Sequence, residues 1–139
     1  AEMKFHDVFA ADRLVALAGV AGGSGQGLAW WNGGPVGRVM SDQGLIDFGQ
    51  RAGEVDSLDG MLLVFSRWAI ETLRFWYRPG FHGYDCDISA LARMQGMKVV
   101  VVDVDAHHHT TLGFKSLASE ADWLDADRQY RQKWGIGDA

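Results

Sequence analysis

The sequence predicts an α/β fold in which a mixed sheet is flanked by helices. Two segments carry most of this prediction. Residues Lys98 to Val104 form a β-branched, apolar run that is typical of a fully buried strand. Residues Tyr84 to Gln95 place Ile88, Leu91 and Ala92 at helical spacing, with acidic residues in the first turn and a glycine directly after the last. Strands that alternate with helices along a chain indicate a mixed α/β sheet.

The first forty residues predict strands joined by glycine-rich turns. Leu14 to Val20 is an apolar run that predicts a buried strand, and residues 21–25 predict a flexible turn after it. The turn signal Asn32-Gly33-Gly34 predicts a hairpin between short strands at residues 28–31 and 35–40.

The rest of the chain predicts a loop, a strand and two further helices. Residues 41–53 are polar and aperiodic and predict a loop. Met61 to Phe65 predicts a strand, and Ser66 to Leu73 then takes up helical spacing. Residues 74–83 contain Pro-Gly and predict an aromatic-lined loop. Residues 117–134 predict an amphipathic helix. The side chains available to dock it are Leu117, Leu124 and Tyr130 or Trp134.

Length and composition limit the class of protein. The 139 residues are 47% hydrophobic and 22% charged, which fits one globular domain spanning residues 1–139. The net charge of -5 has the wrong sign for a protein that binds phosphate backbones, so we do not expect a nucleic-acid partner. No apolar stretch approaches the roughly 20 residues of a membrane span. The single cysteine, Cys86, is expected to be a small buried hydrophobe, and a single thiol favours a cytoplasmic location.

Asp85 is the first candidate for chemistry. It lies in the first turn of a predicted helix, directly after a loop that carries His82. The simplest role for an acid there is capping and compensation of the helix dipole. The alternative is a general base at the lip of a cleft, because a carboxylate there can take a proton from a substrate hydroxyl. Asp59 precedes a glycine, and Asp-Gly is a common turn pair.

Three consecutive histidines follow the predicted strand that begins at Lys98. Successive strand residues face opposite sides, so His107 and His109 share a face and His108 points away from it. The pair can serve as one or two metal ligands, or the three side chains can be hydrogen-bonded or solvated. A zinc hydrolase needs three or four ligands, and Cys86 is the only thiol available.

Two further patterns bear on ligands. The sequence contains no G-x-x-x-x-G-K-[ST] motif and no G-x-G-x-x-G between a strand and a helix, so the usual nucleotide-binding signatures are absent from it. Six tryptophans stand in 139 residues, and Trp30 and Trp31 are adjacent. A tryptophan usually packs in a core or stacks on a flat ligand such as a sugar.

Several of these segments together resemble the C-terminal half of a glycosyltransferase-like family 2 domain. The most specific part is Phe81-His82-Gly83-Tyr84-Asp85, followed at helical distance by Arg93-Met94-Gln95-Gly96 and a valine-rich strand. The resemblance extends over about Leu14 to Trp134. The other matching segments are Leu17 to Gly22, Trp30-Trp31, Val36 to Val39, Val55 to Leu63 and the strand that leads to His107.

The resemblance implies the acceptor-side part of a GT-A fold, in a protein that transfers a sugar from a nucleotide-diphospho-sugar to a hydroxyl of a saccharide acceptor. Asp85 would be the general base, and Asp59 would line the sugar cleft. Tyr84 stands where relatives usually have Glu. The candidate contacts to acceptor or sugar are His82, Tyr84, Trp30 and Trp31. The resemblance also implies that His107 or His109 completes a site for Mn²⁺ or Mg²⁺.

The nucleotide-binding half of such a domain is missing from these 139 residues. We therefore expect the isolated chain to be inactive or nearly so, and an exposed sheet edge favours a homodimer. Two other functions stay open from the residues. One is a non-catalytic remnant that binds a saccharide or a partner, and the other is a small metal-dependent hydrolase built on the histidines.

Overall fold

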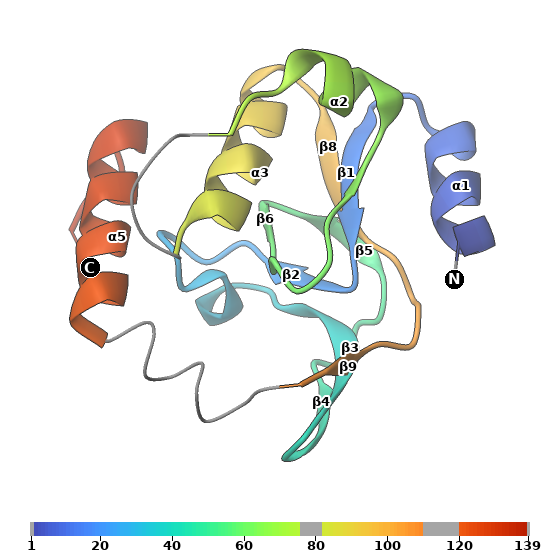
Figure 1. The fold of residues 1–139 in the computed structure, drawn as a ribbon, viewed down its shortest axis with the longest axis horizontal. Helices are drawn as coiled ribbons and strands as arrows, with labels where there is room; N and C mark the ends of the chain where they lie inside the picture. The colour runs from blue at the N-terminus through green and yellow to red at the C-terminus, as the bar shows by residue number, and fades with distance from the viewer. Residues whose placement is uncertain (1, 76–81, 110–119, 139) are drawn as a thin grey trace.

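The computed structural model describes residues 2–75, 82–109 and 120–138 (Figure 1). It confirms the α/β class: one mixed sheet and one mainly antiparallel sheet are flanked by helices. None of the helices in these residues is long and apolar enough to cross a membrane.

The mixed sheet has the strand order β5-β8-β1-β7. Its strands are β5 (Gly53–Val55), β8 (Lys98–Val101), β1 (Val15–Gly19) and β7 (Val64–Phe65). The central strands β1 and β8 are parallel, and the two outer strands are antiparallel to them. Every residue of β1 is buried, as expected for a strand covered on both faces.

The second sheet has the order β4-β3-β2-β6, with β9 paired to β3. Its strands are β4 (Gly44–Asp47), β3 (Val36–Ser41), β2 (Ala21–Gly23), β6 (Ser57–Leu58) and β9 (His107–His108). β9 runs parallel to β3, and all other pairs are antiparallel. This pairing carries the histidine segment to the β3–β4 hairpin (Figure 1).

Helices cover both faces of the mixed sheet. The α-helices are α1 (Glu2–Ala11), α2 (Arg67–Thr72), α3 (Tyr84–Met94) and α5 (Glu120–Trp134). Figure 1 shows α1 and α3 on opposite sides of this sheet, with α5 beside α3. The core alternates accordingly, because successive strand residues face opposite ways. Leu17 and Val99 pack with Ile88 of α3, whereas Ala18 and Val102 pack in the cluster that contains Phe5 of α1.

The helix predictions in the middle of the chain are confirmed. α2 begins after Ser66, whose hydroxyl accepts a hydrogen bond of 3.1 Å from the backbone N–H of Ala69. α3 follows Gly83, which adopts a positive φ of 99°. That backbone conformation favours glycine. Most of the predicted loop at residues 74–83 lies outside the described residues, because 76–81 are not among them.

The glycine-rich segment after β1 is a strand rather than a flexible turn. β2 pairs with both β3 and β6. A Cβ atom on Gly22 would overlap the backbone oxygen of Ser57, so the neighbouring backbones approach too closely for any other residue. The composition therefore suggested flexibility where glycine instead permits close packing.

The predicted hairpin around residues 32–34 is also wrong. Residues 30–32 form a 3-10 helix, η1 (Trp30–Asn32), and β3 pairs with β2 and β4 instead of with residues 28–31. The backbone N–H of Ser24 donates to the oxygen of Gly33, which folds the turn signal back onto the segment after β2. Long-range pairing overrides the local turn signal here.

Three boundaries differ from the sequence prediction. The expected loop at residues 41–53 contains β4, which forms a hairpin with β3. The strand expected at Met61 to Phe65 is reduced to β7, and the strand that begins at Lys98 ends at Val101. β5 and β6 were not predicted, because strands this short carry no periodic signal.

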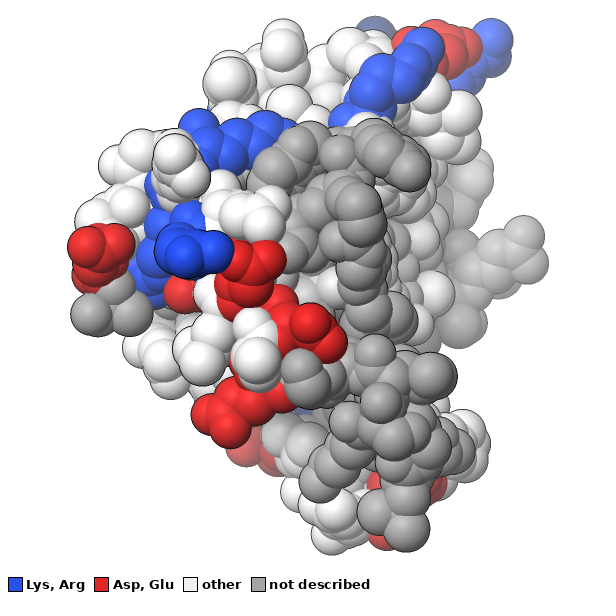
Figure 2. Space-filling model, turned by 60° about the vertical axis from the view of Figure 1, so that its left-hand side comes forward, with Lys and Arg blue, Asp and Glu red and all other residues white. Residues whose placement is uncertain are grey.

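α5 confirms the last predicted helix over residues 120–134, and residues 117–119 lie outside the described part of the chain. Leu124, expected to help dock this helix, is 56% exposed, whereas Tyr130 is 2% exposed and packs in the core. α5 carries Glu120 and Asp122 in its first turn and Arg131 and Lys133 in its last, which complements the helix dipole. Figure 2 shows acidic and basic side chains next to one another on this side of the molecule.

Candidate functional site

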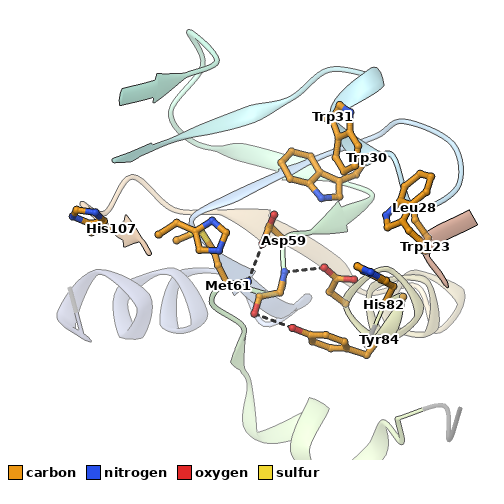
Figure 3. Close-up of a pocket in the computed structure, with 13 residues that line it drawn as sticks. Leu28, Trp30, Trp31, Asp59, Met61, His82, Tyr84, His107 and Trp123 are labelled. Atoms are coloured by element: carbon orange, nitrogen blue, oxygen red, sulfur yellow. Dashed lines mark hydrogen bonds between the residues drawn. The ribbon is translucent and has the colours of Figure 1, made fainter. Parts of the chain in front are cut away.

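A pocket of ≈ 470 Å³ lies where η1, the loop after β6, the start of α3, β9 and α5 meet (Figure 3). Every predicted site residue except His109 lines it. These are Trp30, Trp31, Asp59, His82, Tyr84, Asp85 and His107. Residues scattered along the sequence are thus brought to one pocket.

Asp85 and Tyr84 hold the loop after β6 from the first turn of α3. The Oδ2 atom of Asp85 accepts a hydrogen bond of 2.8 Å from the backbone N–H of Gly60. The Tyr84 hydroxyl donates to the backbone oxygen of Gly60 at 3.2 Å. Figure 3 shows both contacts converging on this one peptide segment. The loop at Gly60, which lines the pocket, is therefore hydrogen-bonded to two adjacent side chains of the helix.

The environment makes Asp85 a stronger base than an ordinary aspartate. Burial raises the pKa of Asp85 to about 6, with a smaller contribution from the charge of Asp59. The backbone N–H groups of Cys86 and Gly60 donate to the carboxylate and oppose part of that rise. Burial also raises the pKa of Tyr84, followed by the charges of Asp85 and Asp59, so its hydroxyl is a neutral donor. A carboxylate with a raised pKa on a pocket wall is a candidate for acid-base chemistry.

Asp59 is held in a tight turn at the pocket wall. Its Oδ1 atom accepts a hydrogen bond of 2.8 Å from the backbone N–H of Met61, and its own N–H donates to the oxygen of Ala21 at 2.9 Å. The turn role expected for the Asp-Gly pair is confirmed, and the same geometry places the side chain beside the pocket.

The two adjacent tryptophans have different environments. Trp30 is 6% exposed and belongs to the core, whereas Trp31 is 46% exposed. Their rings meet edge to face at 5.5 Å between centroids. Trp31 also lies 6.1 Å from the ring of Trp123 on α5, with a tilt of 37°. Trp31 and Trp123 therefore form an indole rim at one end of the pocket (Figure 3).

Buried polar contacts fix α5, and with it Trp123. Asp127, whose side chain is 10% exposed, accepts hydrogen bonds from the Leu28 backbone N–H at 2.7 Å and from Arg131 at 2.8 Å. The Arg131 guanidinium also donates a hydrogen bond to the backbone oxygen of Gln26. These contacts bind the helix to the segment that leads into η1.

A second buried acid joins α5 to α3. Asp87 is fully buried and accepts hydrogen bonds from Lys133 at 2.7 Å and from the indole N–H of Trp134 at 2.9 Å. Cys86, next to it, is 1% exposed, as expected of a small buried hydrophobe, and burial raises the pKa of its thiol. The rim tryptophan therefore sits on a helix with two buried anchors.

The two outer histidines meet a residue that sequence reasoning missed. The Nε2 atom of His107 lies 2.9 Å from Oδ1 of Asp42, and the Nδ1 atom of His109 lies 3.1 Å from the same oxygen. The imidazole rings stack at 4.0 Å between centroids. The predicted shared face of His107 and His109 is confirmed. The side chains of Asp42, His107 and His109 are all exposed.

Trp123, Gly60 and Asp42 are among the residues of this region that the sequence alone did not single out. For Trp123 a signal existed, because it shares helical spacing with Asp127, Tyr130 and Trp134. For Asp42 no local signal existed, since its contact to His107 spans 65 residues.

Comparisons with known proteins add one relative. No protein-family profile matches the sequence. The chain is 33% identical over 134 residues to the streptomycin biosynthesis protein StrF of Streptomyces griseus, an alignment that covers 91% of this chain and 46% of that protein. The chain thus spans about half the length of the curated relative it matches.

Proposed function

We propose that the chain is the acceptor-side part of an enzyme that transfers a sugar from a nucleotide-diphospho-sugar to a hydroxyl group, with Asp85 as the general base. The observation that carries this proposal is the state of Asp85: its carboxylate lines the pocket, is positioned by two backbone N–H groups, and has a pKa raised to about 6. Such a group is still about nine-tenths ionised at pH 7 and binds a proton more readily than an ordinary aspartate.

In the proposed reaction the acceptor hydroxyl gives its proton to Asp85 while its oxygen attacks the anomeric carbon. The bond between that carbon and the diphosphate oxygen breaks, and the diphosphate leaves with the bonding electrons. A divalent metal, when bound, would neutralise charge on the leaving diphosphate. Asp59 and His82 both line the pocket. Asp59 would accept hydrogen bonds from sugar hydroxyls, and His82 would accept or donate them.

The size and lining of the pocket suit a saccharide. Its volume of ≈ 470 Å³ falls within the roughly 300–1,000 Å³ of small-molecule sites. The rim of Trp31 and Trp123 offers apolar ring faces of the kind on which sugar rings stack, beside the carboxylates of Asp59 and Asp85. The printed name of the relative, a streptomycin biosynthesis protein, supports a role of this chain in a biosynthetic reaction.

A non-catalytic saccharide-binding role is the second candidate. The observation that favours it is the indole rim of Trp31 and Trp123, which can stack on a sugar ring without any chemical step. In this role the indole rim and Asp59 would bind a saccharide with no transfer.

The proposal is tested by ligand binding and by product formation. The chain is titrated with uridine diphosphate, a panel of nucleotide sugars and a panel of saccharides, and thermal unfolding is followed, because a ligand that binds the folded state raises the melting temperature. Sugar transfer is measured at high protein concentration by mass spectrometry, since little turnover is expected of these residues alone.

Asp85→Asn is the decisive variant, and Asp56→Asn, at an exposed position outside the pocket, is its matched control. We expect any detected transfer to fall by about 100-fold or more in Asp85→Asn and to stay unchanged in Asp56→Asn. Full transfer in Asp85→Asn would remove Asp85 as the base. Saccharide binding without transfer would favour the second candidate, and no binding of any ligand would overturn both.

A further inference from the structure

We infer that Asp42, His107 and His109 form a binding site for a divalent transition-metal ion, with Zn²⁺ preferred over Mg²⁺. The family resemblance implies a metal near the histidines but names no ligand from the β3–β4 turn, where Asp42 lies. The inference does not rest on the proposed sugar transfer, because metal binding is measured with no sugar present.

The three ligand atoms are already close to the spacing that a metal requires. Oδ1 of Asp42 lies 2.9 Å from Nε2 of His107 and 3.1 Å from Nδ1 of His109, and all three ligand atoms lie within 4.8 Å of one another. In a tetrahedral zinc site with metal-ligand distances of about 2.0–2.1 Å, the ligand atoms are separated by about 3.3 Å. Both distances to Oδ1 of Asp42 lie close to that spacing.

The backbone places the ligands before any metal binds. β9 runs parallel to β3 with Met40 opposite His107 and Ser41 opposite His108, so the residues that directly follow the two strands, Asp42 and His109, lie at the same level. The Ser41 hydroxyl donates to the oxygen of Gly44 at 2.7 Å, which closes the turn that carries Asp42. Such a preset arrangement lowers the entropic cost of binding an ion.

The donor set selects the kind of ion. Two imidazole nitrogens and one carboxylate oxygen suit Zn²⁺ and Co²⁺, whereas Mg²⁺ favours sites made wholly of oxygen atoms. Three protein ligands leave a coordination position for water or a substrate oxygen. His107 also lines the large pocket, at the end away from His82 and Trp123 (Figure 3). The proposed metal site therefore lies next to one end of the pocket.

The competing explanation is a metal-free cluster in which both imidazoles donate N–H groups to one carboxylate oxygen. The two explanations differ in a measurable way. A hydrogen-bonded cluster has no affinity for Zn²⁺ beyond that of surface histidines, whereas a metal site loses affinity when any one of the three ligands is removed.

The test is a competition titration of the purified chain against a chromophoric chelator, with Zn²⁺, Co²⁺, Mn²⁺ and Mg²⁺ in turn. The variants are Asp42→Asn, His107→Ala and His109→Ala, and the matched control is His6→Ala, at an exposed histidine of α1. We expect Zn²⁺ to bind most tightly and Mg²⁺ least, following the general affinity order of nitrogen and oxygen sites. Each ligand variant should weaken Zn²⁺ binding by about tenfold or more, with His6→Ala unchanged.

A second readout separates metal loss from misfolding. The visible absorption of bound Co²⁺ should be present in the wild type and in His6→Ala and lost in each ligand variant. Melting temperatures in the presence of EDTA should agree among all variants, because the three side chains are exposed. Zn²⁺ affinity within twofold of wild type in the three ligand variants, or wild-type affinity no tighter than that of a His107 and His109 double alanine variant, would overturn the site. Metal binding without any saccharide or nucleotide-sugar binding would support this site and count only against the proposed function.

Discussion

The carboxylate of Asp85 and the backbone N–H of Gly60 are joined by a hydrogen bond of 2.8 Å, which ties the first turn of α3 to the loop after β6. Tyr84 reinforces the contact from the same helical turn, through its hydroxyl and the oxygen of Gly60. The helix start thereby both positions a carboxylate and shapes the wall that faces it. Asp85 therefore both holds the loop at Gly60 and presents a carboxylate to the pocket.

The first prediction concerns the close approach at Gly60. A Cβ atom there would overlap the Tyr84 hydroxyl and come within 3.0 Å of its ring, so Gly60→Ala should lower the free energy of unfolding by about 1–3 kcal/mol. Urea denaturation measures the loss. Gly137→Ala is the control, because nothing lies within 4 Å of a Cβ at that position.

A double-mutant cycle tests whether the Tyr84 ring causes this loss of stability. If the Tyr84 ring is the obstacle, Gly60→Ala in a Tyr84→Ala background should cost much less than in the wild type. An equal cost in both backgrounds would show that the penalty arises elsewhere in the loop.

The second prediction concerns pH. The folded-state pKa of Asp85 is raised from the ordinary value of 3.8 to about 6, so the folded state binds this proton more tightly than the unfolded state does. Its contribution to stability is therefore present below pH 4 and is lost as the pH rises through 6. The contribution is at most about 3 kcal/mol. Asp85→Asn should flatten this part of the stability curve, measured by denaturation between pH 4 and 7.

The pH dependence of stability needs a control, and the same pKa also predicts a pH dependence of sugar transfer. Asp56→Asn should keep the wild-type pH profile, since its exposed carboxylate lies outside the pocket. A wild-type slope retained in Asp85→Asn would mean that another group is responsible for it. Any sugar transfer should increase as the pH rises through about 6, because the proposed base must be ionised.

The third prediction contrasts the adjacent tryptophans. Trp30 is in the core, so Trp30→Ala should lower the free energy of unfolding by about 3–5 kcal/mol. Trp31→Ala should cost less than about 1 kcal/mol, because that side chain is 46% exposed. If the rim binds sugar rings, Trp31→Ala should weaken saccharide binding by about threefold to tenfold in calorimetric titration. Unchanged affinity would place the saccharide away from the rim.

The fourth prediction concerns the anchor of α5. Asp127→Ala should cost about 2–4 kcal/mol, because it leaves the Leu28 N–H and Arg131 without their buried acceptor. Hydrogen exchange should show faster opening of residues 120–134 in this variant. Asp125→Ala is the control on the same helix: it removes an exposed ion pair with Arg128 and a hydrogen bond from Gln129, and it should cost less than about 1 kcal/mol. Equal losses would argue against Asp127 as an anchor.

Features that depend on local spacing can be predicted from the sequence. The helix that begins at Tyr84 and the strands that begin at Val15 and Lys98 follow from apolar periodicity, helix-end residues and β-branched runs. The placement of Asp85 in a first helical turn follows with them. The shared face of His107 and His109 also follows from the alternation of a strand.

Contacts between distant residues could not be predicted in this way and are seen in the tertiary structure. The pairing of β9 with β3 brings Asp42 to the histidines, and the docking of α5 brings Trp123 to Trp31. The glycines of β2 suggested a mobile turn until the close approach of Ser57 explained them. The physical reason is the same in each case: local sequence records backbone preference and periodicity, whereas these contacts depend on strand pairing and helix docking between segments far apart in the chain.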